Sequence, residues 1–143
     1  MKFVYLFCTL VYALHTQVLS APPPSKEATY VASLTPDNFN DFVGRDQGVL
    51  VEFFAPWCIH CKRLAPVLEL VGHAFEREKR VRIAKVDAIA HPALKQLYDV
   101  SGFPTLKWFP AGSFVSENFE GSRDAVGIVD YVNSKADKRR PHV

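Results

Sequence analysis

The chain has 143 residues, of which 48% are hydrophobic and 13% aromatic, which is enough for one domain with its own core. This composition excludes disorder along the whole chain. The 17 basic and 15 acidic residues give a net charge of +2, too close to balance for nucleic acid to be the main partner. Several lysines and arginines gather near the end, and we expect residues 137–143 to be a solvated basic tail.

The first twenty residues have the layout of a secretory signal peptide. Lys2 precedes an apolar run at residues 3–14, and small residues follow at Ser20 and Ala21, where we expect cleavage. The run is too short for a membrane anchor, which needs ~20 residues, so we expect no membrane span after cleavage. Residues 21–28 contain three consecutive prolines and are interpreted as an extended leader outside the fold.

The apolar pattern then predicts alternating strands and helices. Thr35 and Ser122 have the side chains expected of helix N-caps, and Pro36 and Pro92 suit first helical positions. This order of elements predicts an α/β domain over residues 29–136, with a mixed central sheet and helices on both faces. We expect strands at 30–34, 49–54, 81–86, 105–109 and 114–119, and helices at 36–43, at 58–79, from 92 and from 122.

Two cysteines define the candidate site. Cleavage of the signal would remove Cys8 and leave Cys58 and Cys61 as the only cysteines of the mature chain, so no disulfide framework can form. The pair is therefore an isolated local bridge, a redox couple or half of a metal site. A structural zinc needs about four ligands, and no second CxxC or paired histidine spacing completes such a set, so we expect no metal.

The spacing of the cysteines suits redox chemistry. A strand that ends near Pro56 and passes into a helix places Cys58 at the helix N-terminus, where free backbone N–H groups favour a thiolate. Cys61 lies three residues further on the same helical face, within reach of a disulfide. We therefore expect Cys58 to be the nucleophile and Cys61 the resolving thiol.

Two motifs extend this to a family resemblance. Residues 51–62, which read Val-Glu-Phe-Phe-Ala-Pro-Trp-Cys-Ile-His-Cys-Lys, resemble the active-site segment of the catalytic domains of protein disulfide isomerases. Residues 102–105, Gly-Phe-Pro-Thr, resemble the cis-proline loop of the same family. The resemblance implies a thioredoxin fold and thiol-disulfide exchange on unfolded or disulfide-containing proteins. It implies no metal or organic cofactor, because electrons pass between sulfur atoms.

His60 and Ile59 separate the two cysteines. An imidazole at residue 60 would stabilise the Cys58 thiolate, although a plain exposed helix residue is the alternative. The family typically has glycine where this chain has Ile59, and this departure adds an apolar side chain beside the reacting sulfur. With Trp57 and Phe103 it would form a hydrophobic rim for unfolded chains, unless these side chains pack inward.

Pro104 is expected to follow a cis peptide bond. Composition alone would favour trans, because ~5–6% of X-Pro bonds are cis, but the resemblance implies the cis form. The resemblance places this turn opposite the cysteines, where the Phe103 backbone could pair with an extended substrate. The alternative is an ordinary proline at a sheet edge.

Glu52 is the sole charge in the apolar run 49–54, and Lys85 lies near the end of the apolar run 81–86, where Arg82 is the other charge. The cost of burying either one alone predicts that they form an ion pair on neighbouring strands. The resemblance implies that Glu52, behind the cysteines, accepts the proton of the resolving thiol and that Lys85 tunes its pKa. The alternative is a purely structural ion pair.

Arg123 stands near the start of the last predicted helix, where a cation opposes the helix dipole. The resemblance supplies a role, because the corresponding loop arginine of isomerase domains can swing toward the resolving cysteine and lower its pKa. A surface arginine is the alternative.

The sequence thus predicts a thiol-disulfide oxidoreductase of the secretory pathway, in the endoplasmic reticulum lumen or secreted. A thiol oxidase or glutathione would serve as upstream redox partner. The last residues do not match a KDEL-type retention signal, so both locations stay open. The alternatives are a substrate-binding or chaperone module and a secreted redox factor that acts on one client.

Overall fold

The computed structural model describes residues 29–137. The predicted signal at 1–20, the leader at 21–28 and nearly all of the basic tail lie outside the described residues. Within the described range, no helix is long and apolar enough to cross a membrane.

A five-stranded mixed sheet forms the centre of the described part, in the strand order β1-β3-β2-β4-β5. The first three strands in the chain are parallel, and β4 and β5 run antiparallel to their neighbours. This confirms the predicted mixed sheet. The bounds are β1 Ala32–Leu34, β2 Gly48–Phe54, β3 Val81–Asp87, β4 Thr105–Phe109 and β5 Glu117–Asn118.

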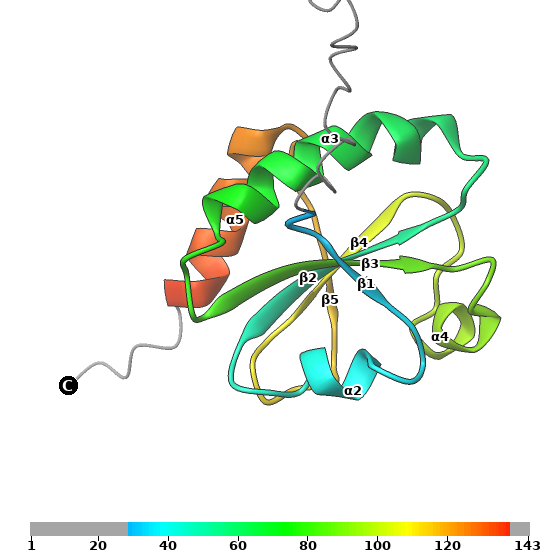
Figure 1. Ribbon diagram of the computed structural model, residues 1–143, viewed down its shortest axis with the longest axis horizontal. Helices are drawn as coiled ribbons and strands as arrows, with labels where there is room; N and C mark the ends of the chain where they lie inside the picture. The colour runs from blue at the N-terminus through cyan, green and yellow to red at the C-terminus, as the bar shows by residue number, and fades with distance from the viewer. Residues whose placement is uncertain (1–28, 138–143) are drawn as a thin grey trace, which may run out of the picture.

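Helices cover both faces of the sheet, as predicted. The long helices α3 (Ile59–Ala74) and α5 (Ala125–Asp137) lie together over one face, and the short helices α2 (Phe39–Phe42) and α4 (Pro92–Leu97) lie on the other (Figure 1). This layering is the thioredoxin fold that the motifs implied.

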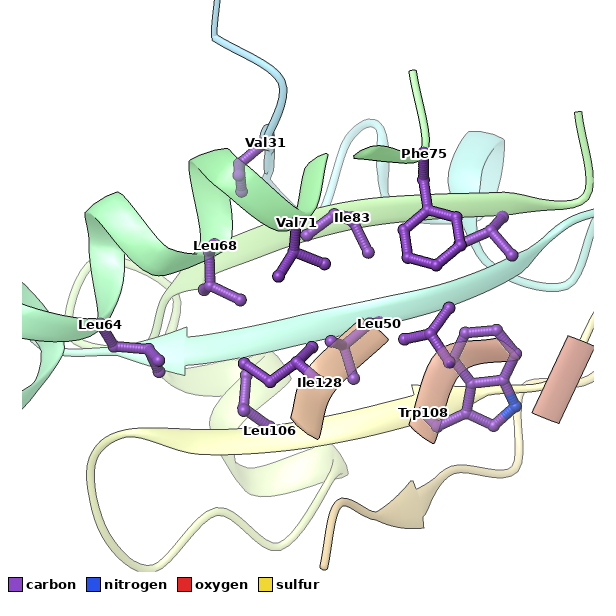
Figure 2. Close-up of a cluster of buried hydrophobic side chains, with 12 residues drawn as sticks. Val31, Leu50, Leu64, Leu68, Val71, Phe75, Ile83, Leu106, Trp108 and Ile128 are labelled. Atoms are coloured by element: carbon purple, nitrogen blue, oxygen red, sulfur yellow. The ribbon is translucent and has the colours of Figure 1, made fainter. Parts of the chain in front are cut away.

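The alternation of side chains along β2 supplies both cores. Val49, Val51 and Phe53 are fully buried toward α2 and α4, whereas Leu50 is buried toward α3 and α5. Figure 2 shows Leu68 pointing from α3 toward the sheet, above Leu50. Each such side chain contributes about 1.5–3 kcal/mol when fully buried. This packing holds α3 against the sheet and so fixes where its N-terminus lies.

Two predicted helices begin later than expected. The helix predicted from Pro36 begins at Phe39, because the Asn38 side chain accepts a hydrogen bond from the Thr35 N–H at 2.8 Å and closes a turn first. The last helix begins at Ala125, and Ser122 is not its cap.

The cap of α5 is Asp124. Its carboxylate accepts the Gly127 N–H at 2.8 Å, and the Ser122 hydroxyl donates to the same carboxylate. Asp124 therefore caps α5, the role that was predicted for Ser122.

Two further predicted elements were longer than the observed ones. Helix α3 ends at Ala74 and not at residue 79, because residues 76–79 are all charged and extend no apolar stripe. The strand predicted at 114–119 pairs only at Glu117–Asn118. Phe114 and Val115 are 51% and 77% exposed, so burial contributes little to holding this segment against β4.

Candidate active site

The junction between β2 and α3 positions the two cysteines. The strand ends at Phe54, the Cys58 N–H donates to the Ala55 carbonyl at 3.0 Å, and Cys58 becomes the N-cap of α3. Its sulfur accepts a hydrogen bond from the Cys61 N–H at 3.3 Å. The predicted placement of Cys58 at a helix N-terminus is confirmed, and its sulfur occupies the position of a capping side chain.

The two thiols have opposite pKa shifts. Hydrogen bonding from the Cys61 side chain, and then from the backbone N–H groups of Cys61 and His60, lowers the pKa of Cys58 against the opposing effect of burial. Burial, and then the hydrogen bond with Cys58, raises the pKa of Cys61 to about 11. Both side chains are free thiols. Of the two, Cys58 is therefore the sulfur that ionises first.

Glu52 lies behind the cysteines on β2. The side chain is 2% exposed, its Oε1 atom has no hydrogen-bond partner, and it lines a pocket together with Cys61 and Lys85. Burial raises the pKa of Glu52 to about 7, although the charges of Lys85 and Arg123 oppose this rise. A carboxyl with this pKa can exist in both protonation states near neutral pH.

The predicted ion pair between Glu52 and Lys85 was wrong. The two residues are register partners on β2 and β3, yet in residues 29–137 no ion pair joins them. Lys85 is only half-buried near the end of β3, so its amine needs no carboxylate to offset its burial. The charge of Lys85 still lowers the pKa of Glu52.

The cis-proline loop lies against the cysteines. The Phe103–Pro104 bond is cis, as the resemblance implied. The half-buried Phe103 packs against the cluster formed by Ala55, Cys58 and Cys61. The loop thus brings a residue from before β4 to the start of α3.

Arg123 joins the same loop from the other side. Its Nη2 donates to the Pro104 carbonyl at 3.2 Å. Because α5 begins at Ala125, Arg123 lies before the helix and before its capping residue Asp124, not in the first turn. The charge of Arg123 lowers the pKa of Glu52.

The apolar side chains around Cys58 differ in exposure. Trp57 is 69% exposed and Ile59 is 56% exposed, so neither packs inward. The Trp57 ring meets the ring of Phe103 edge-on, with centroids 6.0 Å apart, and Lys95 Nζ lies 5.8 Å from the Phe103 centroid. The structure therefore presents two exposed apolar side chains on either side of Cys58 in the chain, and Phe103 contacts one of them, Trp57.

The imidazole of His60 contributes nothing to the pKa shift of Cys58. Its side chain is exposed and, among the described residues, makes no hydrogen bond or ion pair. The contribution of His60 to the Cys58 pKa comes from its backbone N–H. In the same residues no group of three or more His, Cys, Asp or Glu side chains could hold a metal ion.

Lys107, a buried cation on β4, was not predicted from the sequence. The side chain is 7% exposed, and its Nζ donates to Asn118 Oδ1 at 2.7 Å. Like Glu52 in β2, it is the only charge in an apolar strand, so the same signal could have found it.

Comparison with known proteins identifies the family. The family described as Thioredoxin matches residues 30–134. The chain belongs to the thioredoxin family. The solution structure of the first thioredoxin domain of mouse Protein disulfide-isomerase A4 is similar with a TM-score of 0.70 and 33% identity, over 87% of this chain and 94% of that domain. The crystal structure of the Trx4 domain of ERdj5 gives a TM-score of 0.70 and 30% identity, over 78% of this chain and 99% of that domain.

Among full-length proteins, the relatives are named protein disulfide isomerases. The chain is 43% identical to Protein disulfide isomerase-like 2-2 of Oryza sativa subsp. japonica, over 94% of this chain and 36% of the relative. It is 48% identical to Probable protein disulfide-isomerase A6 of Medicago sativa, over 78% of this chain and 30% of the relative. The chain thus spans about a third of the length of these plant relatives. The predicted resemblance to this group is confirmed.

Proposed function

We propose that this chain is a thiol-disulfide oxidoreductase that uses Cys58 and Cys61 on disulfide-containing or unfolded protein substrates. The observation that carries the proposal is the divergence of the two thiols, with the pKa of Cys58 lowered and that of Cys61 raised to about 11. One sulfur is prepared to attack while the other is held protonated until needed. The isomerase names of the relatives support the same reaction.

The reductive direction proceeds in two exchanges. The Cys58 thiolate attacks one sulfur of the substrate disulfide, and the other substrate sulfur leaves with the electron pair as a thiolate. The Cys61 thiol then loses its proton and attacks the Cys58 sulfur. This step forms the Cys58–Cys61 disulfide and releases the second substrate sulfur. The oxidative direction is the reverse.

Glu52 is assigned the proton of Cys61. A thiol with a pKa of about 11 does not ionise unaided near neutral pH, and the pocket behind it holds a carboxyl whose pKa is about 7. The carboxylate form can accept the proton in the second exchange and return it in the reverse direction. Lys85 and Arg123 keep a larger fraction of Glu52 ionised, because their charges lower its pKa.

Trp57, Ile59, Phe103 and Pro104 are assigned to substrate contact. The exposed side chains of Trp57 and Ile59 offer apolar area beside Cys58, and Phe103 of the cis-proline loop packs against the cluster that contains both cysteines. Burial of exposed apolar area on both partners favours an unfolded chain as substrate. We place the protein in the endoplasmic reticulum lumen or outside the cell, after loss of residues 1–20. The isomerase-like relatives and the targeting layout of the sequence support this location.

The test is turnover of a disulfide-bonded protein in a glutathione buffer, with the full chain, Cys58→Ser and Cys61→Ser. We expect no turnover from Cys58→Ser, and from Cys61→Ser an accumulated mixed disulfide between Cys58 and substrate. Turnover that survives Cys58→Ser would overturn the proposal. Suppression of substrate aggregation that is equal in all three proteins, without turnover in any, would instead establish the chaperone module.

A further inference from the structure

A second surface feature begins beside the cysteines and runs along α3. A groove is lined by side chains from three separate segments: one face of α3, the cis-proline loop and the turn before α5. Helices α3 and α5 lie together on one face of the sheet, which brings the turn before α5 near α3 (Figure 1). Its lining residues are His60, Arg63, Leu64, Val67, Pro104 and Arg123.

The spacing of the α3 residues explains why they share the groove. Positions 60, 63, 64 and 67 follow the three- and four-residue steps that place side chains on one face of a helix. Leu64 is buried and Val67 half-buried, so they form the floor with Pro104. The floor is therefore apolar and continuous with the core.

The walls of the groove carry charge of one sign. Arg63 and Arg123 are exposed guanidinium groups, His60 adds an exposed imidazole, and no acidic side chain lines the groove. Arg123 is held in place by its hydrogen bond to the Pro104 carbonyl at 3.2 Å. Arg63 makes no ion pair within residues 29–137. Two cations over an apolar floor are complementary to a segment that is apolar in part and negatively charged.

We propose that this groove receives the substrate chain on one side of its reactive disulfide and selects an acidic side chain there, with Arg63 as the specificity-determining residue. The inference rests on the proposed function, because the segment is delivered by the disulfide that Cys58 attacks. His60 stands two residues from Cys58, and Pro104 adjoins Phe103, which packs against the cluster of Ala55, Cys58 and Cys61. An extended chain held by a sulfur at Cys58 thus enters the groove within a few residues.

The selection changes no step of the chemistry. Cys58 still forms the mixed disulfide, the substrate S–S bond breaks, and the leaving sulfur takes the electron pair as a thiolate. Arg63 acts on binding of the flanking segment. An exposed ion pair of this kind corresponds to about a two- to five-fold preference. The preference should fall as ionic strength rises, because salt screens exposed charges.

The test uses synthetic peptides that share one disulfide and differ only in a Glu, Gln or Lys placed one to three residues from a reactive cysteine. kcat/KM for reduction is measured with the full chain at low and high salt. We expect the order Glu over Gln over Lys at low salt, with about a two- to five-fold step that shrinks at high salt. Arg63→Gln should remove the preference, and Arg63→Glu should reverse it.

Arg77→Gln is the matched control, because Arg77 is exposed, carries the same charge and lines a different surface. It should leave the order of the peptides unchanged. Equal rates on the three peptides with the wild-type chain, or an unchanged order in Arg63→Glu, would overturn the selection while leaving the oxidoreductase intact. Absence of turnover on every peptide would count against the proposed function itself.

Discussion

Glu52 and Lys85 face each other in register across β2 and β3 and line the same pocket behind Cys61, yet no ion pair within residues 29–137 joins them. Glu52 therefore bears most of the cost of its own burial, with only the longer-range help of Lys85 and Arg123. This arrangement holds the pKa of the carboxyl at about 7. It makes Glu52 costly for stability and useful for proton transfer.

Glu52→Gln should change how stability depends on pH. The pKa of Glu52 rises from 4.5 to about 7 on folding, so the folded state holds its proton more tightly than the unfolded state. The stability linked to this proton is complete below pH 4.5 and is lost as pH rises through about 7. At ~1.4 kcal/mol per unit of pKa, this loss is about 3 kcal/mol. At pH 8 the reduced variant should be more stable than the wild type, by up to that amount.

Urea unfolding of the two reduced proteins between pH 4 and pH 8 measures this difference. The gap should close toward the acidic end of the range. Two curves that stay parallel across it would show that Glu52 does not carry the buried charge described here.

The same substitution should slow the second exchange. Removal of the carboxylate leaves the Cys61 thiol, with its pKa of about 11, without a nearby base, and a positioned base typically contributes ~10²–10⁴-fold. With a small thiol bound to Cys58 as a mixed disulfide, the rate of release by Cys61 should rise as pH passes about 7 in the wild type and lose this rise in Glu52→Gln. The initial attack by Cys58 is the control and should not slow. Identical release rates in the two proteins from pH 6 to pH 9 would remove Glu52 from the mechanism.

Arg123→Gln should move the pH at which the second exchange becomes fast. The charge of Arg123 lowers the pKa of Glu52, so its removal raises that pKa further and shifts the rise in release rate to higher pH. The same mixed-disulfide assay reads the shift. Arg77→Gln, which removes an equal charge from a distant surface, should leave the midpoint in place. A midpoint that is unchanged in Arg123→Gln would leave this residue a surface arginine.

Lys107 and Asn118 should behave as a coupled pair in stability measurements. Asn118 supplies the hydrogen bond to the buried Lys107 amine, and a buried charged group that loses its partner costs about 1–3 kcal/mol or more. Asn118→Ala should therefore destabilise the chain by roughly that amount. Lys107→Met removes the buried charge together with its need for a hydrogen-bond partner. The free energy of unfolding of this variant should therefore stay close to that of the wild type. Denaturant unfolding of both variants and the double variant checks this, and a harmless Asn118→Ala beside a costly Lys107→Met would contradict it.

Features encoded in adjacent residues were predictable from the sequence. The position of Cys58 follows from a buried strand, Pro56 and an amphipathic helix in direct succession, and the structure places it at the helix N-cap. The cis bond before Pro104 was predictable only through the family resemblance, because composition favours trans.

Features that depend on side-chain direction or on distant segments were not predictable from the sequence. The charges of Glu52 and Lys85 within two apolar runs indicated that these residues are neighbours, but the register of the strands does not decide whether their side chains meet. Asp124 caps α5 because its carboxylate reaches the Gly127 N–H, and the sequence, with Ser122 and Asp124 two residues apart, does not decide which of them is the cap. The groove with Arg63 is formed by segments about sixty residues apart in the chain, so no local sequence pattern predicts it.

The most direct test of the account is the ionisation of each thiol in the reduced wild-type chain. Alkylation by a small neutral reagent is followed by mass spectrometry at each of Cys58 and Cys61 across pH. We expect Cys58 to react at a lower pH than an ordinary thiol, whereas Cys61 stays unreactive until strongly alkaline pH, near its pKa of about 11. Two cysteines that react together at an ordinary thiol pH, or a Cys61 that reacts first, would contradict it.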